Sequence, residues 1–279
     1  MRRSRLFVTV QFFIGSSKLH SNEDLELILS STFLADLEYH KTIGSTNDRA
    51  LQLMQTQELK LPFLVLAETS TASRGRENRK WFSPLGTINQ TLIIDADEYG
   101  LSMDRTPVVS LLMALSVAET IASLVPEQAT QVKWPNDVYV DDRKISGILI
   151  ERPPKNQNRL AIGIGINVNN SFATASQEFQ DKATSLVDSS GEEHSLSRVI
   201  VELIKRVDSN LQDFKQGRLD LCSTWQQFCF LTGKSIVLID GARTISGLCL
   251  GINSTGAIVI RTEGRETLEI ISGSIESFR

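Results

Sequence analysis

The pattern of hydrophobic residues changes near residue 232 of this 279-residue chain. Before that point, strand-like and helix-like segments follow one another. After it come only short β-rich runs, separated by turns such as Asp240-Gly241 and Glu263-Gly264. Short strands spaced by such turns are typical of a small barrel of about five strands. The sequence therefore predicts a larger α/β (α+β) unit, residues 41–231, followed by a small β-barrel, residues 232–279.

The strands of the larger unit are predicted from short apolar runs. Residues 63–67, 89–95 and 160–169 each have the length and composition of a buried strand. Residues 132–151 indicate a strand, a turn, a strand, a tight turn and a third strand. We therefore expect a mixed sheet in this unit.

We expect four helices in the same unit, at residues 45–54, 106–126, 195–217 and 219–231. Ser45 and Ser195 stand where N-caps are expected, and Thr106-Pro107 combines a cap with proline at the first position. A helix N-terminus also attracts anions and carbonyl groups, so the Ser45 region could hold a polar ligand. The helix at 106–126 is apolar enough to be buried, but its serines, threonine and glutamate make it too polar for a membrane span.

Residues 1–40 are predicted to be an N-terminal extension of uncertain structure. They contain one weakly helical piece, residues 23–30, and are too short for a winged-helix module of three helices. The first 22 residues carry four basic side chains and no acidic one. We favour a strand or a disordered extension there over a targeting peptide.

The loop after the predicted strand at 63–67 concentrates positive charge. Arg74, Arg76, Arg79 and Lys80 lie within seven positions, and Gly75 allows close approach of the backbone to a ligand. Guanidinium groups bind carboxylate and phosphate oxygens in pairs. The whole chain has a net charge of −4, so any anion binding must be local. The alternative is a solvated basic loop without a ligand.

A second group of polar residues lies in the segment 132–151. Asn136 and Asp137 belong to a turn by composition, yet Asp137 could help to hold Mg²⁺ or a ribose hydroxyl, and Lys144 could reach a phosphate. Gly163 and Gly165 lie on one face of a predicted strand. A bulky group, or only another backbone, should pack there.

The cysteines and histidines exclude other classes of site. Three scattered histidines do not form a zinc site, and the three cysteines contain no Cys-x-x-Cys pair. An odd number of cysteines fits a reducing compartment, so we expect a cytoplasmic protein.

Several motifs together resemble the biotin protein ligases, also called biotin–[acetyl-CoA-carboxylase] ligases. The resemblance runs from residue 45 to the end of the chain. It includes Ser-Thr-Asn at 45–47, Arg-Gly-Arg-x-x-Arg-Lys-Trp-Phe-Ser-Pro at 74–84, Lys-Trp-Pro-Asn-Asp at 133–137, Asp-Arg-Lys-Ile-Ser-Gly-Ile-Leu-Ile-Glu at 142–151, Gly-Ile-Gly-Ile-Asn at 163–167 and Ala-Thr-Ser-Leu at 183–186. The fold that it implies is a class II synthetase-like mixed sheet with packed helices, followed by an SH3-like barrel.

The reaction implied by the resemblance joins biotin to ATP. It produces biotinyl-5′-AMP and pyrophosphate, with Mg²⁺, and then transfers the biotinyl group to one lysine of a biotin carboxyl carrier protein, a subunit of acetyl-CoA carboxylase. The absence of a winged-helix module implies a ligase without a repressor function and without DNA or a membrane as partner. The family includes monomers and homodimers.

The resemblance also implies roles for individual residues. Lys144 and Arg76 would be catalytic, and Asp137 would be the candidate Mg²⁺ ligand. Biotin would be bound by Ser45, Thr46, Asn47, Ser70, Arg74, Gly75, Arg76, Lys144 and Gly147. ATP or the adenylate would be bound by Arg74, Arg76, Arg79, Trp81, Asn136, Asp137, Lys144 and Asn167.

Two departures from the family pattern concern the arginine loop. Ser70 stands where the family usually has glutamine, and Ser73 where it has glycine. Two other functions remain as alternatives. Lipoate-type protein ligases share the fold but lack the arginine loop with its tryptophan. A non-catalytic adenylate-binding protein would have little reason to keep Lys144.

Overall fold

The computed structural model describes residues 21–55, 59–173 and 175–279. The predicted strand or extension at residues 1–20 lies outside this part. Up to residue 231 the helices and strands are α1 (Asn22–Ser31), β1 (Asp36–Ile43), α2 (Thr46–Leu53), β2 (Phe63–Ser70), η1 (Arg76–Asn78), β3 (Thr87–Asp95), η2 (Asp97–Tyr99), η3 (Met103–Arg105), α3 (Thr106–Leu124), β4 (Thr130–Lys133), β5 (Asp137–Val140), β6 (Arg143–Glu151), β7 (Arg159–Asn167), α4 (Gln177–Lys182), α5 (Leu186–Ser190), α6 (Leu196–Lys215) and α7 (Leu221–Phe228).

Seven strands form one mixed sheet in the order β1-β2-β3-β7-β6-β5-β4. β1 and β2 are parallel, and the remaining neighbours are antiparallel. The central strands are apolar on both faces, as expected for a sheet that is covered on both sides. The mixed sheet predicted from the sequence is confirmed.

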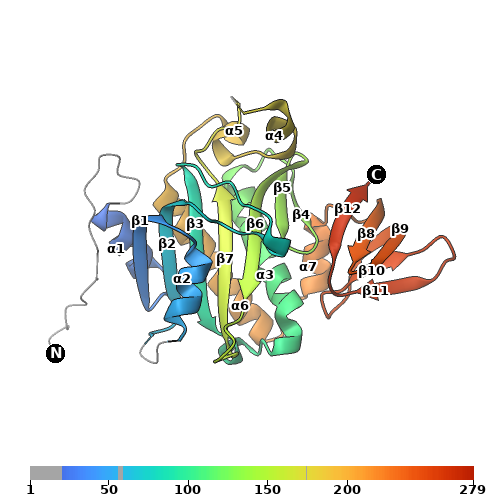
Figure 1. Cartoon of the computed structure of the whole chain (residues 1–279), viewed down its shortest axis with the longest axis horizontal. Helices are drawn as coiled ribbons and strands as arrows, with labels where there is room; N and C mark the ends of the chain where they lie inside the picture. Colours follow the sequence, from blue (N-terminus) through green and yellow to red (C-terminus); the bar gives the residue numbers. More distant parts are fainter. Residues whose placement is uncertain (1–20, 56–58, 174) are drawn as a thin grey trace.

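Helices cover the two faces of this sheet unequally (Figure 1). Behind it, α3 and α6 pack on a large apolar core that also includes α1 and α7. In front, α2 contacts β2, β3 and β7, where Ala50 and Met54 bury a smaller cluster with Phe63, Val65 and Ile93. The front of the sheet beyond α2 is therefore left for a loop and a cavity.

The start of α3 differs from the prediction. Thr106 is not the N-cap, because η3 precedes α3 and the N-cap is Arg105, which makes no side-chain capping bond. Instead the Thr106 hydroxyl donates to the carbonyl of Met103 (2.9 Å). The physical reason is that the 3-10 turn already pairs backbone N–H groups, such as that of Thr106 with the carbonyl of Met103, which a free helix start would leave to a capping side chain.

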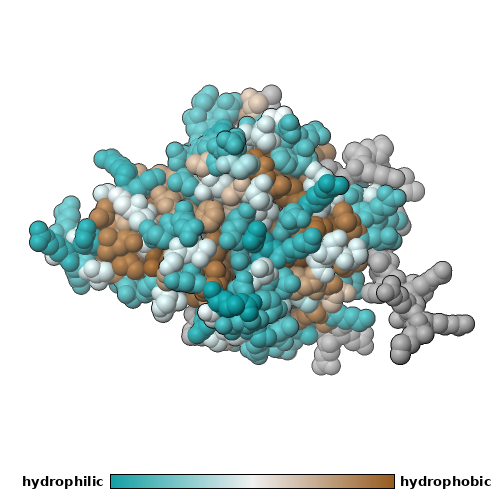
Figure 2. All heavy atoms as spheres, turned by 180° about the vertical axis from the view of Figure 1, so that it is seen from behind, coloured by the Kyte–Doolittle hydropathy of each residue, from teal (hydrophilic) through white to brown (hydrophobic). Residues whose placement is uncertain are grey.

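Helix α3 is the most apolar helix of the fold. Among the described residues it alone is long and apolar enough to cross a membrane, but 67% of its apolar window is buried inside the protein. On the rear face of the molecule, hydrophilic residues predominate and hydrophobic ones gather in separate patches (Figure 2). Burial of α3 against the sheet and α6 identifies it as a core helix.

The C-terminal strands form a second, antiparallel sheet beside the first (Figure 1). Its order is β11-β10-β9-β8-β12. Its strands are β8 (Ser235–Asp240), β9 (Arg243–Ile252), β10 (Ile258–Arg261), β11 (Thr267–Ile270) and β12 (Ser274–Phe278). The expected number of strands is confirmed, although β12 was not foreseen as a separate run. The indole nitrogen of Trp134 donates to the carbonyl of Gly256 (3.1 Å) and joins the two units.

Other elements confirm or extend the prediction. The weakly helical piece at 23–30 is α1, which begins with a capping box formed by Ser21 and Asp24. The short helices α4 and α5 were not predicted, because neither is long enough to show an apolar period. Helix α1 and the start of β1 fall within the predicted extension, and the domain limits at 40 and 232 stay predictions.

Candidate active site

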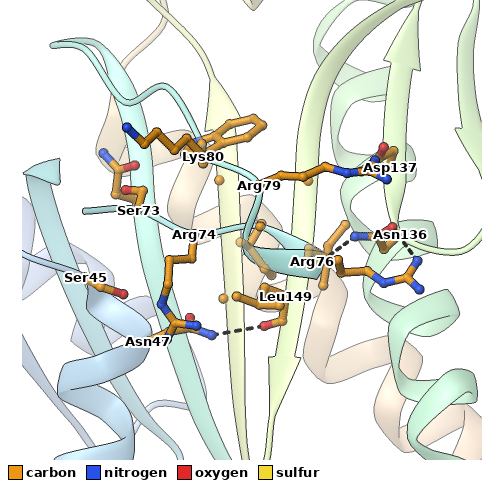
Figure 3. Close-up of a pocket in the computed structure, with 18 of the residues that line it drawn as sticks. Ser45, Asn47, Ser73, Arg74, Arg76, Arg79, Lys80, Asn136, Asp137 and Leu149 are labelled. Carbon is orange, nitrogen blue, oxygen red and sulfur yellow. Dashed lines mark hydrogen bonds between the residues drawn. The ribbon is translucent and has the colours of Figure 1, made fainter. Parts of the chain in front are cut away.

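A cavity of about 200 Å³ opens on the front of the large sheet. Its walls come from separate parts of the chain: the start of α2, the loop between β2 and β3, β3 itself, the turn before β5, the front of β6, the front of β7, and Ser274 of the barrel. Figure 3 shows Ser45 and Asn47 at one end, Arg76, Asn136 and Asp137 at the other, and Arg74 between them pointing toward Asn47. Cationic side chains outnumber the acidic ones in this lining, so the cavity favours an anion.

The first turn of α2 forms one end of the cavity. Ser45 is the N-cap, and its side chain accepts from the backbone nitrogen of Asp48 (3.3 Å), which confirms the predicted cap. The hydroxyl of Thr91 donates to Oγ1 of Thr46 (2.9 Å) and to Oδ1 of Asn47 (2.7 Å). Ser45, Thr46 and Asn47 are buried, so their polar atoms are held in fixed directions at the end of the cavity.

Glycines form the floor beneath the cavity. A Cβ atom on Gly163 would lie 2.1 Å from Oδ1 of Asn47, and one on Gly165 would lie 2.6 Å from the indole ring of Trp81. At Gly147 an added Cβ would contact both Lys144 and Trp81. The bulky groups expected over these strands are therefore Asn47 and Trp81.

Arg74 and Arg76 extend from the loop in opposite directions. Arg74 forms ion pairs with Asp48 and with Glu151 (3.3 Å to the latter). Arg76 donates to Oδ1 of Asn136 (3.4 Å) and to the carbonyl of Gly273 in the barrel (2.9 Å). Burial lowers the pKa of the Arg76 guanidinium, so this charge would gain from an anionic ligand that replaces lost water.

The outer part of the loop is more exposed. The side chain of Arg79 is 67% exposed and pairs with Glu77 (2.7 Å). Glu77 has φ 56° and ψ 32°, a left-handed conformation that glycine or asparagine adopts more easily. The sequence puts Glu77 where the family often has other residues, and the ion pair with Arg79 offsets part of the backbone cost.

Lys144 lies next to the arginine loop. Its Nζ atom is 2.6 Å from Oδ1 of Asp137 and 5.7 Å from the centre of the Trp81 ring. The backbone of Lys144 is also fixed, because its carbonyl accepts from the nitrogen of Thr184 (3.0 Å). Two distant segments of the sequence thus bring their cations to a single cavity, as predicted.

Replacing Asp137 by asparagine should lower kcat roughly tenfold. The amine of Lys144 would no longer be held by charge, and an amine displaced by a fraction of an ångström loses much of its effect on a reacting group. Asparagine has almost the same shape but does not hold the lysine by charge. The turnover rate of the reaction proposed below, under saturating substrates, measures the change. A variant with unchanged kcat would contradict this role, and Asp181→Asn on exposed α4 is the matched control.

Two residues of the predicted site lie elsewhere. The Ser70 hydroxyl donates to the carbonyl of Gly44 (2.7 Å) and does not line the cavity. Asn167 donates to the carbonyl of Thr184 (3.0 Å) and accepts from Asn170 (3.2 Å), so it ties β7 to the segment before α5. The remaining predicted residues line the cavity: Ser45, Thr46, Asn47, Arg74, Gly75, Arg76, Arg79, Trp81, Asn136, Asp137, Lys144 and Gly147.

Several polar residues near the cavity were not among the predicted site residues. Asn89 lines it and accepts from the Ser83 hydroxyl (2.6 Å). Asp48 and Glu151 pair with Arg74, and Ser274 reaches the lining from the barrel. Glu151 ends the motif at 142–151 and the strand β6, but neither Glu151 nor Asp48 was given a role in the site from the sequence.

Comparisons with known proteins agree with this geometry. The Biotin/lipoate A/B protein ligase family matches residues 39–169, and the Biotin protein ligase C terminal domain matches residues 232–276. The chain is 31% identical to the bifunctional ligase/repressor BirA of Bacillus spizizenii over 231 residues, which are 81% of this chain and 70% of that protein. It is 27% identical to the biotin–[acetyl-CoA-carboxylase] ligase of Mycobacterium tuberculosis, with 77% and 79% covered.

A solved structure shows the same likeness in three dimensions. The biotin protein ligase from Aquifex aeolicus in complex with biotin and ATP superposes with a TM-score of 0.76 and 29% identity, covering 88% of this chain and 99% of that one. The sequence, the fold and the residues around the cavity therefore indicate the same family. The chain belongs to the biotin/lipoate A/B protein ligase family, among the biotin protein ligases.

Proposed function

We propose that this enzyme activates biotin with ATP as biotinyl-5′-AMP and transfers the biotinyl group to a lysine of a biotin carboxyl carrier protein. The observation that carries the proposal is the convergence of Arg74, Arg76 and Lys144 on a cavity that ends at a helix N-terminus. A cavity with polar groups at one end and cations at the other suits an acid that meets a nucleotide. The solved relative with biotin and ATP bound supports the same pairing of substrates.

We assign biotin to the α2 end of the cavity. Ser45, Thr46 and Asn47 present fixed polar atoms there, which suit the carbonyl and N–H groups of the biotin ring. Gly147 and Gly163 line the cavity beside these residues, where the apolar tail would lie. The carboxylate of the tail would then point toward Arg74, Arg76 and Lys144.

The nucleotide would occupy the other end. Arg76, Arg79 and Lys144 would bind its phosphates, and Trp81 would enclose the adenine side. Asn136 and Asp137 would complete this end, which the barrel approaches through Gly273 and Ser274. We therefore assign catalysis to residues 41–231 and a closing role to the barrel, residues 232–279.

In the first step the biotin carboxylate attacks the α-phosphorus, a new P–O bond forms, and the bond to pyrophosphate breaks. Lys144 and Arg76 offset the negative charge that accumulates as two anions approach. In the second step the lysine amine of the carrier attacks the acyl carbon. The C–O bond to AMP breaks, AMP leaves as an anion, and the new amide nitrogen loses its proton to water.

The residues present fit a Mg²⁺ ion that enters with ATP. Protein sites for Mg²⁺ often use one or two carboxylates together with substrate phosphates. Asp137 provides such a carboxylate in the lining, and among the described residues there is no cluster of three or more His, Cys, Asp or Glu side chains that would form a closed metal site. Mg²⁺ held by Asp137 and the phosphates would neutralise part of the phosphate charge.

We place the reaction in the cytoplasm, because all three cysteines are free.

The proposal is tested by incubating the protein with ATP, Mg²⁺, a carrier domain, and either biotin or lipoate. Mass spectrometry of the carrier should show the gain of one biotinyl group with biotin, and no gain without ATP or with a carrier whose target lysine is replaced by arginine. A gain only with lipoate would identify a lipoate-type ligase. No gain with either acid would contradict the proposed activity.

A further inference from the structure

Glu151 uses its two carboxylate oxygens for two different parts of the site. Oε2 accepts from Nδ2 of Asn47 (2.7 Å), at the start of α2. Oε1 accepts from Nη1 of Arg74 (3.3 Å), in the arginine loop. Glu151 is the last residue of β6, and its side chain is 24% exposed and outside the cavity lining. It therefore contacts the binding residues without reaching the ligand itself.

The contact with Asn47 determines which way that amide faces. A carboxylate only accepts hydrogen bonds, so it holds the NH₂ group of Asn47 on its own side. The opposite atom, Oδ1, then accepts from the Thr91 hydroxyl (2.7 Å) above Gly163. Without Glu151, among the described residues, the NH₂ group would keep the carbonyl of Leu149 (3.3 Å), a longer contact that restrains the amide less than the carboxylate does.

The contact with Arg74 links the same carboxylate to the loop. Arg74 has a second acidic partner, Asp48, whose hydrogen bond is the main cause of the raised pKa of this guanidinium. Only Glu151 of these two acids also binds Asn47. In Figure 3 the guanidinium of Arg74 lies against Asn47, with the rest of the loop above it.

We propose that Glu151 is a positioning residue that couples the acid-binding end of the cavity to the arginine loop. Glu151 already bonds to both Asn47 and Arg74, so an acid that binds against Asn47 adds a further restraint, which Glu151 passes to Arg74 and to the loop expected to cover the nucleotide. The inference rests on the proposed function, because it assigns the acid to the α2 end. It predicts that biotin orders the loop through Glu151 even before ATP binds.

Three variants separate the two contacts. Glu151→Ala removes both of them. Glu151→Gln keeps an oxygen for Asn47 but presents an amide, without charge, to Arg74. Asp48→Asn weakens the other ion pair of Arg74 and leaves the Asn47 contact in place. Glu178→Ala is the control for an exposed carboxylate, since Glu178 is 74% exposed and pairs only with Lys182 among the described residues.

Trypsin provides a direct readout, because the loop itself contains Arg74, Arg76, Arg79 and Lys80 as cleavage sites. The rate of loop cleavage is measured with and without saturating biotin, next to the Kd for biotin by calorimetry and the melting temperature. In the wild type we expect biotin to slow cleavage. In Glu151→Ala we expect the Kd to rise about tenfold, as for loss of a charged hydrogen bond, and the protection by saturating biotin to disappear.

The remaining variants decide the cause. Glu151→Gln should retain most of the biotin affinity and lose most of the protection, whereas Glu178→Ala should retain both. Asp48→Asn is expected to leave the loop less stable, but saturating biotin should still slow its cleavage, because the link from Asn47 through Glu151 to Arg74 is intact. Equal protection in all variants at saturating biotin would overturn the coupling while leaving the proposed function intact. A wild type that does not bind biotin would overturn both. If Glu151→Ala does not fold, Glu151→Gln alone still tests the link to Arg74.

Discussion

Replacing Lys144 by alanine is expected to slow adenylate formation by about 10²-fold or more, the usual effect of losing one positioned charge at a reacting centre. Lys144 is held on one side by Asp137 (2.6 Å) and lies over Trp81. Its charge is thus available at a fixed place, and water does not substitute for it in a partly closed cavity. Biotin-dependent exchange of pyrophosphate into ATP measures this step without the carrier.

The control for this variant is Lys182→Ala. Lys182 lies in α4, is 71% exposed and pairs with Glu178 on the surface, so its loss should leave the exchange rate unchanged. The melting temperature of both variants should stay near that of the wild type. An exchange rate for Lys144→Ala within threefold of the wild type, at about equal stability, would show that the charge at this position does not act on the reaction.

Much of the fold could be predicted from periodicity and turn chemistry. The strands from 63 to 169 are mostly short apolar runs with clear breaks, and α6 has an apolar face that repeats at helical spacing. The features that were missed depend on contacts that local patterns do not contain. Thr106 was misplaced because η3 comes before α3, and β12 was missed because its residues are half exposed and pair with the distant β8.

The site, like the fold, could be predicted only in part. The arginine loop concentrates positive charge and Lys144 adds another cation, so their chemistry is visible in the sequence. The order of the strands in the sheet then brings them together. Ser70 and Asn167 were assigned by motif alone, but each side chain bonds to a backbone carbonyl nearby. Glu151 ends a recognised motif, but its role could not be inferred, because its partners Asn47 and Arg74 are 104 and 77 positions away in the sequence.

The acid-binding end should be most sensitive to a single methyl group at Gly163. The Cβ atom of alanine would lie 2.1 Å from Oδ1 of Asn47, far inside any permitted contact. Asn47 has little freedom to yield, since it is 5% exposed and bonded to Thr91, Leu149 and Glu151. Overpacking costs about 1–3 kcal/mol, so Gly163→Ala should weaken biotin binding by roughly tenfold to a hundredfold when that cost falls on the bound state.

Calorimetric titration with biotin measures this effect, and alanine substitutions at two other glycines serve as comparisons. Gly44→Ala has no atom within 4 Å of the new Cβ and should bind biotin like the wild type, although Gly44 directly precedes Ser45. In Gly165→Ala the new Cβ would lie 2.6 Å from Trp81, but this ring belongs to the loop and can move away. This variant should therefore weaken biotin binding less than ATP binding. If Gly163→Ala bound biotin as tightly as Gly44→Ala, the start of α2 would not be the place where the acid is recognised.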